Sequence, residues 1–171
     1  GWRNCAFNEE SPPDTHPVKN GVFRVQQQPS DGATFLGLVV RANGEVEAVG
    51  QPLPSPLLAG QCYAFSIQLC RSENLFSRNR SGNTINYNAP AMLQIWGGIS
   101  PCGKKTLLAE SPPVEHTDWK NYEFVLQPGE SDITHITLEA FYVPLAGAPY
   151  DGNILLDKAS ALLPADCKTG Q

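Results

Sequence analysis

Prolines and glycines occur along the whole length of this sequence, fifteen of each in 171 residues. A proline inside an α-helix costs about 3 kcal/mol, because it removes a backbone donor and clashes with the preceding turn. Long helices are therefore nearly excluded. What remains is a series of short runs with β-type alternation, separated by segments typical of turns.

The clearest of these runs is QCYAFSIQLC, residues 61–70. Alternation places Tyr63, Phe65, Ile67 and Leu69 on one face, which predicts a strand with one core face and one more polar face. Further strands are expected at 34–41, 45–51, 91–96, 105–110, 119–127, 133–143 and 153–163, with 21–28 a strand or an irregular edge. A helix is an open alternative for 153–163, because of its Leu and Ala content.

Turn chemistry separates these runs. Asn43-Gly44 joins two of them, and both residues accept the positive φ of a type I′ hairpin turn. Residues 1–20 and 52–60 have the composition of loops, and 71–89 is the longest irregular polar stretch. Eight or nine short strands at this spacing predict an all-β fold, an antiparallel β-sandwich of the jelly-roll type, in one domain spanning 1–171.

Charged residues make up only 17% of the chain, and the formal net charge is −5. Nucleic-acid binding needs a basic stripe, but the longest basic run is Lys104-Lys105, so no nucleic acid is expected as a partner. No apolar run approaches the roughly 20 residues that span a bilayer, so no membrane insertion is expected either. The sequence starts at Gly1-Trp2, which we interpret as the start of a mature or trimmed product. A missing opening strand is an open alternative.

The five cysteines include no CxxC pair, which disfavours a zinc site. They predict two disulfides and one spare thiol in an oxidising compartment, and hence a secreted or cell-surface location. Cys62 and Cys70 cannot pair if they share one strand, since eight residues of strand would separate them by roughly 26 Å. Cys5 with Cys102, both in loop-like sequence, is the first expected pair, and Cys62 with Cys167 is the second.

Catalytic signatures are absent from the sequence. There is no GxSxG elbow and no HExxH motif. His16 and His116 follow prolines near carboxylates, but no residue is marked as a nucleophile for a triad. We therefore expect no enzyme, although an acid pair of the glycosidase kind could be drawn, without diagnostic spacing, from Glu110, Glu115, Asp118 and Glu139.

Aromatic residues near loops are the candidate ligand-binding residues, because a flat ring offers a stacking surface for a sugar. Tyr87 lies in the long polar stretch and is expected to be exposed. Trp96 precedes Gly97-Gly98, which allow a ligand to approach closely. A core position is the alternative for each aromatic, and it is the one we expect for Trp119. The candidates are Trp2, Tyr87, Trp96, Tyr142 and Tyr150.

Asp14 and His16 complete the set of candidate ligand-binding residues. They belong to SPPDTH at 11–16, which is echoed by SPPVEH at 111–116. Each copy would present a histidine and a carboxylate on a proline-stiffened loop. Coincidence is the alternative, because the flanking sequences do not match.

Three segments resemble the galactose-binding-like jelly roll of bacterial carbohydrate-binding modules: AGQCYAFSIQL (59–69), TDWKNYEFVLQP (117–128) and YDGNILLDKASAL (150–162). The chain is most similar to surface-protein modules of gliding, polysaccharide-degrading bacteria. That similarity lies in GWRNC (1–5), SPPDTHP (11–17), FLGLVVRANGEVEAVGQ (35–51), IWGG (95–98) and LEAFY (138–142).

This resemblance implies a non-catalytic module that binds a polysaccharide, attached to a larger secreted or cell-surface protein. A structural or adhesion spacer that mediates protein contacts at the cell surface is the alternative. Such jelly rolls often hold a structural calcium ion, and the usual carboxylate of the closing strand corresponds to Asp157. A second acidic residue of the family pattern is replaced by Lys158, and the usual opening carboxylate has no match.

Overall fold

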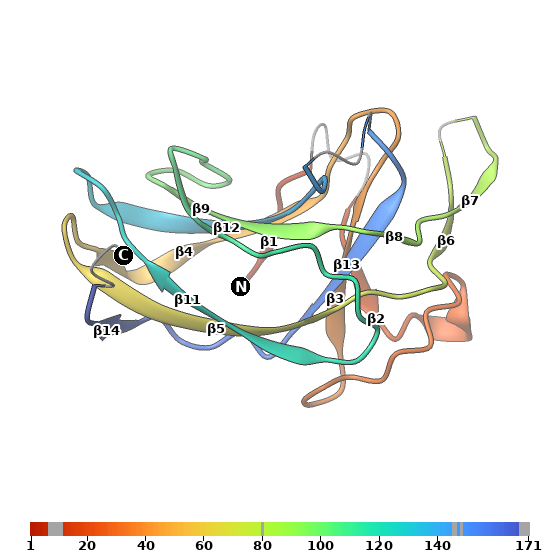
Figure 1. Cartoon of the computed structure of the whole chain (residues 1–171), viewed down its shortest axis with the longest axis horizontal. Helices are drawn as coiled ribbons and strands as arrows, with labels where there is room; N and C mark the ends of the chain where they lie inside the picture. Colours follow the sequence, from red (N-terminus) through yellow and green to blue (C-terminus); the bar gives the residue numbers. More distant parts are fainter. Residues whose placement is uncertain (7–11, 80, 145–146, 148, 168–171) are drawn as a thin grey trace.

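The computed structural model describes residues 1–6, 12–79, 81–144, 147 and 149–167. Two sheets face each other across an apolar core (Figure 1). Sheet A is antiparallel, with the strand order β1-β4-β12-β9-β10. Its strands are β1 (Arg3–Asn4), β4 (Ala48–Leu57), β12 (Ile133–Phe141), β9 (Met92–Gly98) and β10 (Thr106–Glu110).

Sheet B follows the order β11-β5-β13-β3-β2, with β14 beside β5 and β8 beside β13. All of its pairings are antiparallel except that of β8 with β13. A small third sheet pairs β6 (Phe76–Arg78) with β7 (Thr84–Asn86). The strands of sheet B are β11 (Lys120–Leu126), β5 (Cys62–Cys70), β13 (Gly152–Asp157), β3 (Phe35–Val40), β2 (Asp14–His16), β14 (Leu163–Ala165) and β8 (Ala89–Pro90).

The main core lies between the sheets, and strand alternation explains it. Tyr63, Phe65, Ile67 and Leu69 of β5 are all buried in it, as the sequence predicts. Sheet A contributes alternate residues of β9 and β12 to the same cluster, among them Leu93, Ile95, Ile136, Leu138 and Ala140. The all-β sandwich expected from the sequence is thereby confirmed.

A second apolar cluster covers part of the outer face of sheet B. Phe35 and Leu155 of the sheet pack there with Leu75 and Tyr87 from the segment between β5 and β8. This polar-looking stretch therefore folds back onto the sandwich instead of forming a free loop. Sheet B is buried on both faces at this end, which also accounts for the complete burial of Cys70, the free thiol among the described residues.

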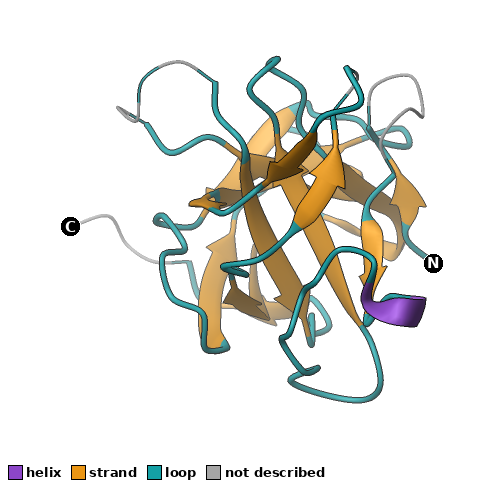
Figure 2. Ribbon diagram, turned by 90° about the vertical axis from the view of Figure 1, so that its right-hand side faces the viewer, coloured by secondary structure: helices purple, strands orange, loops and turns teal. Residues whose placement is uncertain are grey.

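Two loop assignments from the sequence are wrong in part. Residues 1–20 contain β1, β2 and the 3-10 turn Lys19–Gly21, which Figure 2 shows outside the strands. Residues 52–57 extend β4 instead of connecting strands. The exposed Pro52, Pro54 and Pro56 are tolerated there because β1 pairs only with Val49 and Gly50, so the rest of this side of β4 is a sheet edge.

The hairpin at Asn43-Gly44 forms, but with different turn geometry. Gly44 has φ 90°, whereas Asn43 is not among the residues with positive φ. The Gly44 amide donates to the Arg41 carbonyl at 2.9 Å, and the Arg41 amide donates to the Glu45 carbonyl. This is the longer hairpin loop in which a left-handed glycine follows the turn, so only one residue needs positive φ.

Both expected disulfides are present. Cys5 pairs with Cys102, and Cys62 pairs with Cys167. Cys62 and Cys70 stand at opposite ends of β5, which leaves Cys70 as the unpaired thiol. The first bridge joins the N-terminal segment to the loop after β9, and the second joins β5 to the C-terminal segment.

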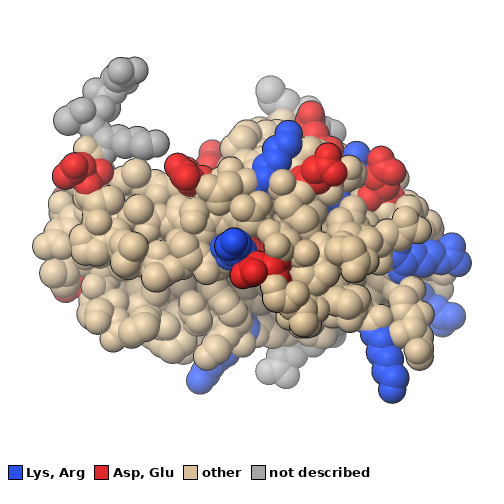
Figure 3. Space-filling view, turned by 90° about the horizontal axis from the view of Figure 1, so that it is seen from below, with Lys and Arg blue, Asp and Glu red and all other residues tan. Residues whose placement is uncertain are grey.

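The face of the molecule on the side of sheet B carries few charged side chains, and these are scattered (Figure 3). This agrees with the low charged fraction of the sequence, 17%. No basic stripe is visible on this face. Among the described residues, no helix is long and apolar enough to cross a membrane.

Candidate functional site: the outer face of sheet A

The outer face of sheet A is defined by the residues that alternate with the core. Leu93 and Ile95 point into the core, so Gln94 and Trp96 of β9 point outward. By the same alternation Thr137 and Glu139 of β12 point outward, because Ile136, Leu138 and Ala140 point into the core. Cross-strand register then aligns these side chains in two rows, Ala48–Glu139–Gln94–Glu110 and Gly50–Thr137–Trp96–Leu107.

Glu139 is the polar centre of this face. Its side chain is only 3% exposed, and it forms an ion pair with Lys104. The Trp96 indole Nε1 donates to the other carboxylate oxygen at 3.0 Å. The Gln94 amide Nε2 lies 3.4 Å from a carboxylate oxygen of Glu110. Glu110 and Glu139, the two acid-pair candidates that lie on this sheet, therefore share one face. Lys104 neutralises the charge of Glu139.

Burial increases steadily across the face from β10 to β4. Glu110 on β10 is exposed, Gln94 is 8% exposed, Glu139 3% and Ala48 1%. The second row has the same gradient, from Leu107 at 40% through a half-buried Trp96 to Thr137 at 0%. The face is therefore open along the β10 edge and closed on the β4 side.

The closed end is built by the loop between β9 and β10. This loop folds directly over the outer side of Gly98, where a Cβ atom would lie 2.5 Å from the Gly103 carbonyl oxygen. Over Gly50, the Cys5 Sγ atom occupies the position 2.9 Å from where a Cβ would stand. The Cys5–Cys102 disulfide thus fastens the loop to the N-terminal segment across this end of the sheet.

Two buried polar atoms on this face have no hydrogen-bond partner: the Gln94 Oε1 and the Thr137 Oγ1. The Thr137 hydroxyl lies beside Gly50, where a Cβ would come within 3.2 Å of it. A buried polar atom without a partner costs about 1–3 kcal/mol, so such atoms are rare in folded proteins. Both atoms lie on one face of sheet A, beside the Glu139–Lys104 ion pair.

Trp96 is the one predicted ligand-binding residue that the structure places on this face. Trp2 lies elsewhere, at the open side of the sandwich, where it borders an apolar groove of about 660 Å³. Phe141, which the sequence did not single out, is 38% exposed on β12, and its neighbours on the outer face include Met92 by register. Phe141 and Leu107 add apolar surface next to the polar rows.

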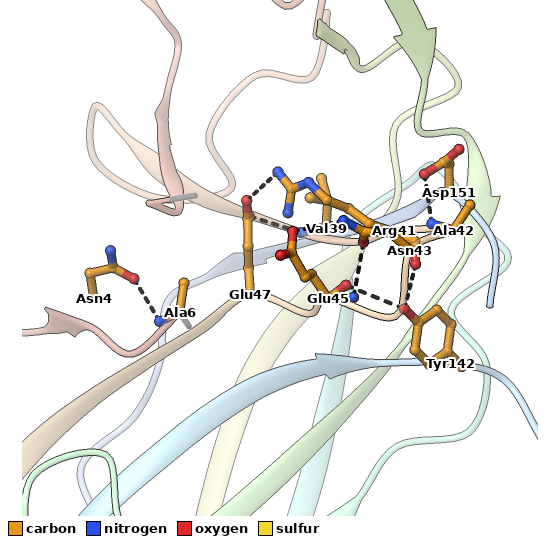
Figure 4. A network of polar contacts seen from close by, with 10 residues as sticks. All are labelled: Asn4, Ala6, Val39, Arg41, Ala42, Asn43, Glu45, Glu47, Tyr142 and Asp151. Atoms are coloured by element: carbon orange, nitrogen blue, oxygen red, sulfur yellow. Dashed lines mark hydrogen bonds and ion pairs between the residues drawn. The ribbon is translucent and has the colours of Figure 1, made fainter. Parts of the chain in front are cut away.

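The prediction that Tyr87 is exposed is wrong. Its side chain is 0% exposed and belongs to the second apolar cluster, with the guanidinium of Arg41 centred 5.4 Å from its ring. Arg41 also pairs with the buried Glu47 at 2.8 Å, and the other Glu47 oxygen accepts from the Val39 amide (Figure 4). This network fixes the β3–β4 hairpin.

Asp14 and His16 share one side of β2, as alternation requires, but His16 is buried and Asp14 is half-buried. His16 is 1% exposed and stacks on Phe35, with ring centroids 5.2 Å apart. Burial lowers the pKa of His16 to about 4. Burial raises the pKa of Asp14 to about 6, although the charge of Arg41 opposes this rise. His116, in the echoed segment, instead contacts the Tyr122 hydroxyl at 2.8 Å.

Tyr142 and Tyr150 contact each other edge to face, with centroids 5.4 Å apart. Their hydroxyls bond to backbone: Tyr142 donates to the Arg41 carbonyl, and Tyr150 to the Pro90 carbonyl at 2.8 Å. Trp119 is half-buried against the second cluster and donates to the Gln28 carbonyl. These aromatics tie loops to the sandwich, and the ligand contacts predicted for Tyr142 and Tyr150 stay predictions.

The Asp157 carboxylate receives three backbone N–H groups. Ser30 and Asp31 donate to one oxygen at 2.7 and 3.0 Å, and Lys158 donates to the other at 2.7 Å. Calcium needs six to eight oxygen ligands, whereas these neighbours supply donors. The described residues contain no group of three or more His, Cys, Asp or Glu side chains placed to hold a metal. These contacts do not by themselves fit calcium, which stays a prediction.

Sequence reasoning missed Gln94, Thr137 and Lys104 as site residues, and weighed Glu139 only as a possible member of an acid pair. The usable signal is alternation, because Met92, Gln94 and Trp96 are the outward residues of one strand. Met92 and Trp96 are large and apolar, unlike the polar residues usual on an exposed strand face. What the sequence does not contain is the register that places Thr137 and Glu139 beside them.

Comparison with known proteins identifies the fold of this chain. No family model and no curated protein matches the sequence. The CBM22-1 xylan-binding domain of Paenibacillus barcinonensis Xyn10C matches 98% of this chain and 87% of that domain, with TM-score 0.54 and 12% identity. The chain has the β-sandwich fold of carbohydrate-binding modules. The resemblance inferred from the sequence is confirmed at the level of fold.

The same fold also occurs in other settings. The CBM22-1 module of Clostridium thermocellum xylanase 10B, in a structure with xylohexaose, matches 97% of this chain and 26% of that chain, with TM-score 0.52 and 10% identity. A Stig cyclase from Fischerella sp. TAU, bound to an indole compound, matches 97% and 85%, with TM-score 0.54 and 11% identity. Because one fold carries both binding and catalysis, function must be argued from the site.

Proposed function

We propose that this protein is a non-catalytic glycan-binding module of a secreted or cell-surface protein, and that the outer face of sheet A binds the glycan. The observation that carries the proposal is the pair of buried, unpartnered polar atoms, Gln94 Oε1 and Thr137 Oγ1, on that face. A sugar hydroxyl can both donate and accept, so it suits an amide oxygen and a hydroxyl group equally well.

The rest of the face also supports a sugar ligand. Glu139 and Lys104 offer an acceptor and a donor side by side, and Trp96 and Phe141 add aromatic surface at its margin. A few fixed polar groups among apolar side chains are usual for a small-ligand site. The two disulfides support an oxidising, extracellular setting, and the fold shared with carbohydrate-binding modules is compatible with it.

The first experiment is a binding panel of plant, algal and bacterial polysaccharides, read by affinity electrophoresis and then by calorimetry. Gln94→Ala is expected to weaken binding about tenfold, since one hydrogen bond to a buried group is worth roughly 1.4 kcal/mol. Gln68→Ala is the matched control, because Gln68 lies on sheet B and its amide nitrogen donates to the Asn121 side chain. The control should bind as the wild type does.

Two results would overturn the proposal. No binding by any member of the panel would favour the spacer function instead. Release of reducing ends from a bound polysaccharide, abolished by Glu139→Gln or Glu110→Gln, would show that the two carboxylates of the face are catalytic.

A further inference from the structure

We propose that the apolar groove on the open side of the sandwich is a second binding site, which takes an anionic amphiphile: a long alkyl chain with one anionic head group. The groove has a volume of about 660 Å³. A smaller hollow of about 290 Å³ continues it, since Trp2 and Ala159 line both. This surface is separate from the outer face of sheet A, so the inference does not depend on the glycan site.

Two segments without a charged residue form the walls of the groove. One wall is the end of β4 and the residue after it, from Gln51 to Leu58, which is roughly 20 Å of extended chain. The other wall is 159–164, the segment that leads into β14. Figure 1 shows β14 and the end of β4 at the same end of the sandwich. The floor consists of core residues from both sheets, Phe65 of β5 and Ile136 of β12. A long apolar hollow of this shape suits an extended alkyl chain.

The buried polar groups of the groove already have partners, which disfavours a sugar as its ligand. The Tyr63 hydroxyl accepts from the Leu58 amide at 2.9 Å and donates to the Gln61 Oε1 at 3.3 Å. Among the described residues, none that lines the groove or the hollow has a buried side-chain polar atom without a partner. Binding free energy at this site must therefore come mainly from the burial of apolar surface.

The rim of the groove carries large apolar side chains that protein atoms leave uncovered. Trp2 is 41% exposed and Leu58 is 42% exposed. Exposed apolar surface beside a hollow is typical of a ligand-binding groove. A polypeptide suits it less well, because Pro54 and Pro56 have no N–H groups to offer to a peptide backbone. An alkyl chain needs no hydrogen-bond donor.

The charge of Lys158 determines the sign of the head group. Asp157 and Lys158 are the charged residues among the described residues that line the groove and the hollow. Three backbone N–H groups satisfy the Asp157 carboxylate, whereas the exposed Lys158 side chain has no ion pair or hydrogen bond with a described residue. The Lys158 ammonium is therefore free to pair with an anionic head group at the hollow, while the alkyl chain passes Trp2 and lies along β4.

The first test measures the binding of straight-chain alkyl carboxylates of six to sixteen carbons by calorimetry, below their critical micelle concentrations. We expect one molecule to bind per protein, with an affinity that rises by up to about fourfold for each added CH₂ until the groove is full. Absence of binding at every length, or an affinity that does not depend on length, would overturn the proposal.

A variant at the junction of the groove and the hollow tests the location. Ala159 is exposed, so Ala159→Phe should leave the Tm unchanged while its ring blocks the passage, and we expect at least a tenfold loss of affinity. Ala33→Phe is the matched control, because Ala33 is exposed and lines neither cavity. Unchanged affinity of Ala159→Phe would overturn the proposal.

A second variant tests the head group. Lys158→Asn removes the charge, and asparagine tolerates the positive φ of 50° at this position. We expect a threefold to fivefold loss of affinity for the carboxylates and no change for alkyl alcohols of the same length. Lys120→Asn on β11 is the control, since Lys120 lines neither cavity. An equal loss for carboxylates and alcohols, or no loss for either, would overturn the anionic head group.

Fluorescence places the chain without a change to the groove itself. An alkyl carboxylate brominated along its chain quenches a tryptophan that it contacts. We expect the bound molecule to quench the wild-type protein, and most of this quenching to disappear in Trp2→Phe, which keeps an apolar ring at the rim. Quenching of the same size in both proteins would place the ligand elsewhere and overturn the proposal.

Discussion

At the scale of single residues, Asp14 and His16 respond to burial in opposite ways. Each neutral form is favoured in the folded protein, since burial raises the pKa of Asp14 to about 6 and lowers that of His16 to about 4. Stability linked to Asp14 falls as pH rises from about 4 to 6, because the carboxyl must ionise in a buried position. Stability linked to His16 rises between about pH 4 and 6.5, as its unfolded form loses a proton.

The two effects offset each other in the wild-type protein, so a variant is needed to separate them. Asp14→Asn removes the buried ionisation, and we predict a higher Tm than the wild type at pH 7 and no difference near pH 4. Thermal melts of both proteins from pH 4 to 7 measure this difference. A gap in Tm that is constant with pH would contradict the assignment of the raised pKa to Asp14.

Asn153 is a fully buried amide that holds the second apolar cluster to sheet B. Its side chain accepts from the Ser72 amide and donates to the Ser72 and Tyr87 carbonyls. Asn153→Leu leaves these three groups without partners, and we predict a loss of about 3 kcal/mol in the free energy of unfolding. Denaturant unfolding measures it. The same change at the exposed Asn121 should have little effect.

Asp157 organises the turn at Ser30 and Asp31 through its carboxylate. Asp157→Asn should lower the unfolding free energy by about 1–2 kcal/mol, because hydrogen bonds to a charged acceptor are the stronger kind. Thermal melts of the wild type and of Asp157→Asn, with and without EDTA, test for the expected calcium ion. If the ion is bound, EDTA lowers the Tm of the wild type but not that of the variant. A wild-type Tm that EDTA leaves unchanged argues against the ion.

At the scale of elements, the loop between β9 and β10 is held by a contact that only glycine permits. Gly98→Ala would place a methyl group 2.5 Å from the Gly103 carbonyl oxygen, so the loop must move. We predict a lower Tm and weaker glycan binding. Gly129→Ala is the matched control, because a Cβ there meets nothing within 4 Å. Equal behaviour of the two variants would contradict the role given to this contact.

The strands themselves follow from sequence, because alternation is a local property. The predicted ends of β5 and β11 differ from the observed ends by at most one residue. The face of β5 that was predicted to enter the core does so. Tyr87 was misplaced because Leu75 and Tyr87 have no regular spacing, and nothing local says that their segment folds onto the outer face of sheet B. Trp96 is marked in the sequence by Gly97-Gly98, whereas its hydrogen-bond partner Glu139 lies 43 residues away along the chain.

At the scale of the whole molecule, the two disulfides enclose almost the entire chain in covalent loops. The bridges span 97 and 105 residues, and a loop of this length gives each about 4–5 kcal/mol in the chain-entropy account. We predict a large fall in Tm with reductant. Thiol labelling under non-reducing conditions should find no reactive cysteine while folded and one after unfolding, since Cys70 is buried and its pKa is raised to about 12. Labelling of three or more thiols would contradict this pairing.

The prolines of β4 affect how closely placed copies of the protein can interact. Three of the six residues from Pro52 to Leu57 have no N–H group, and they stand along the free edge of sheet A. Prolines on an edge strand cannot donate the hydrogen bonds that a neighbouring polypeptide would need to extend the sheet past this edge. If the protein is displayed densely on a cell or repeated along one chain, each copy should remain a separately folded domain. Neighbouring copies should not join edge to edge in a continuous β-sheet.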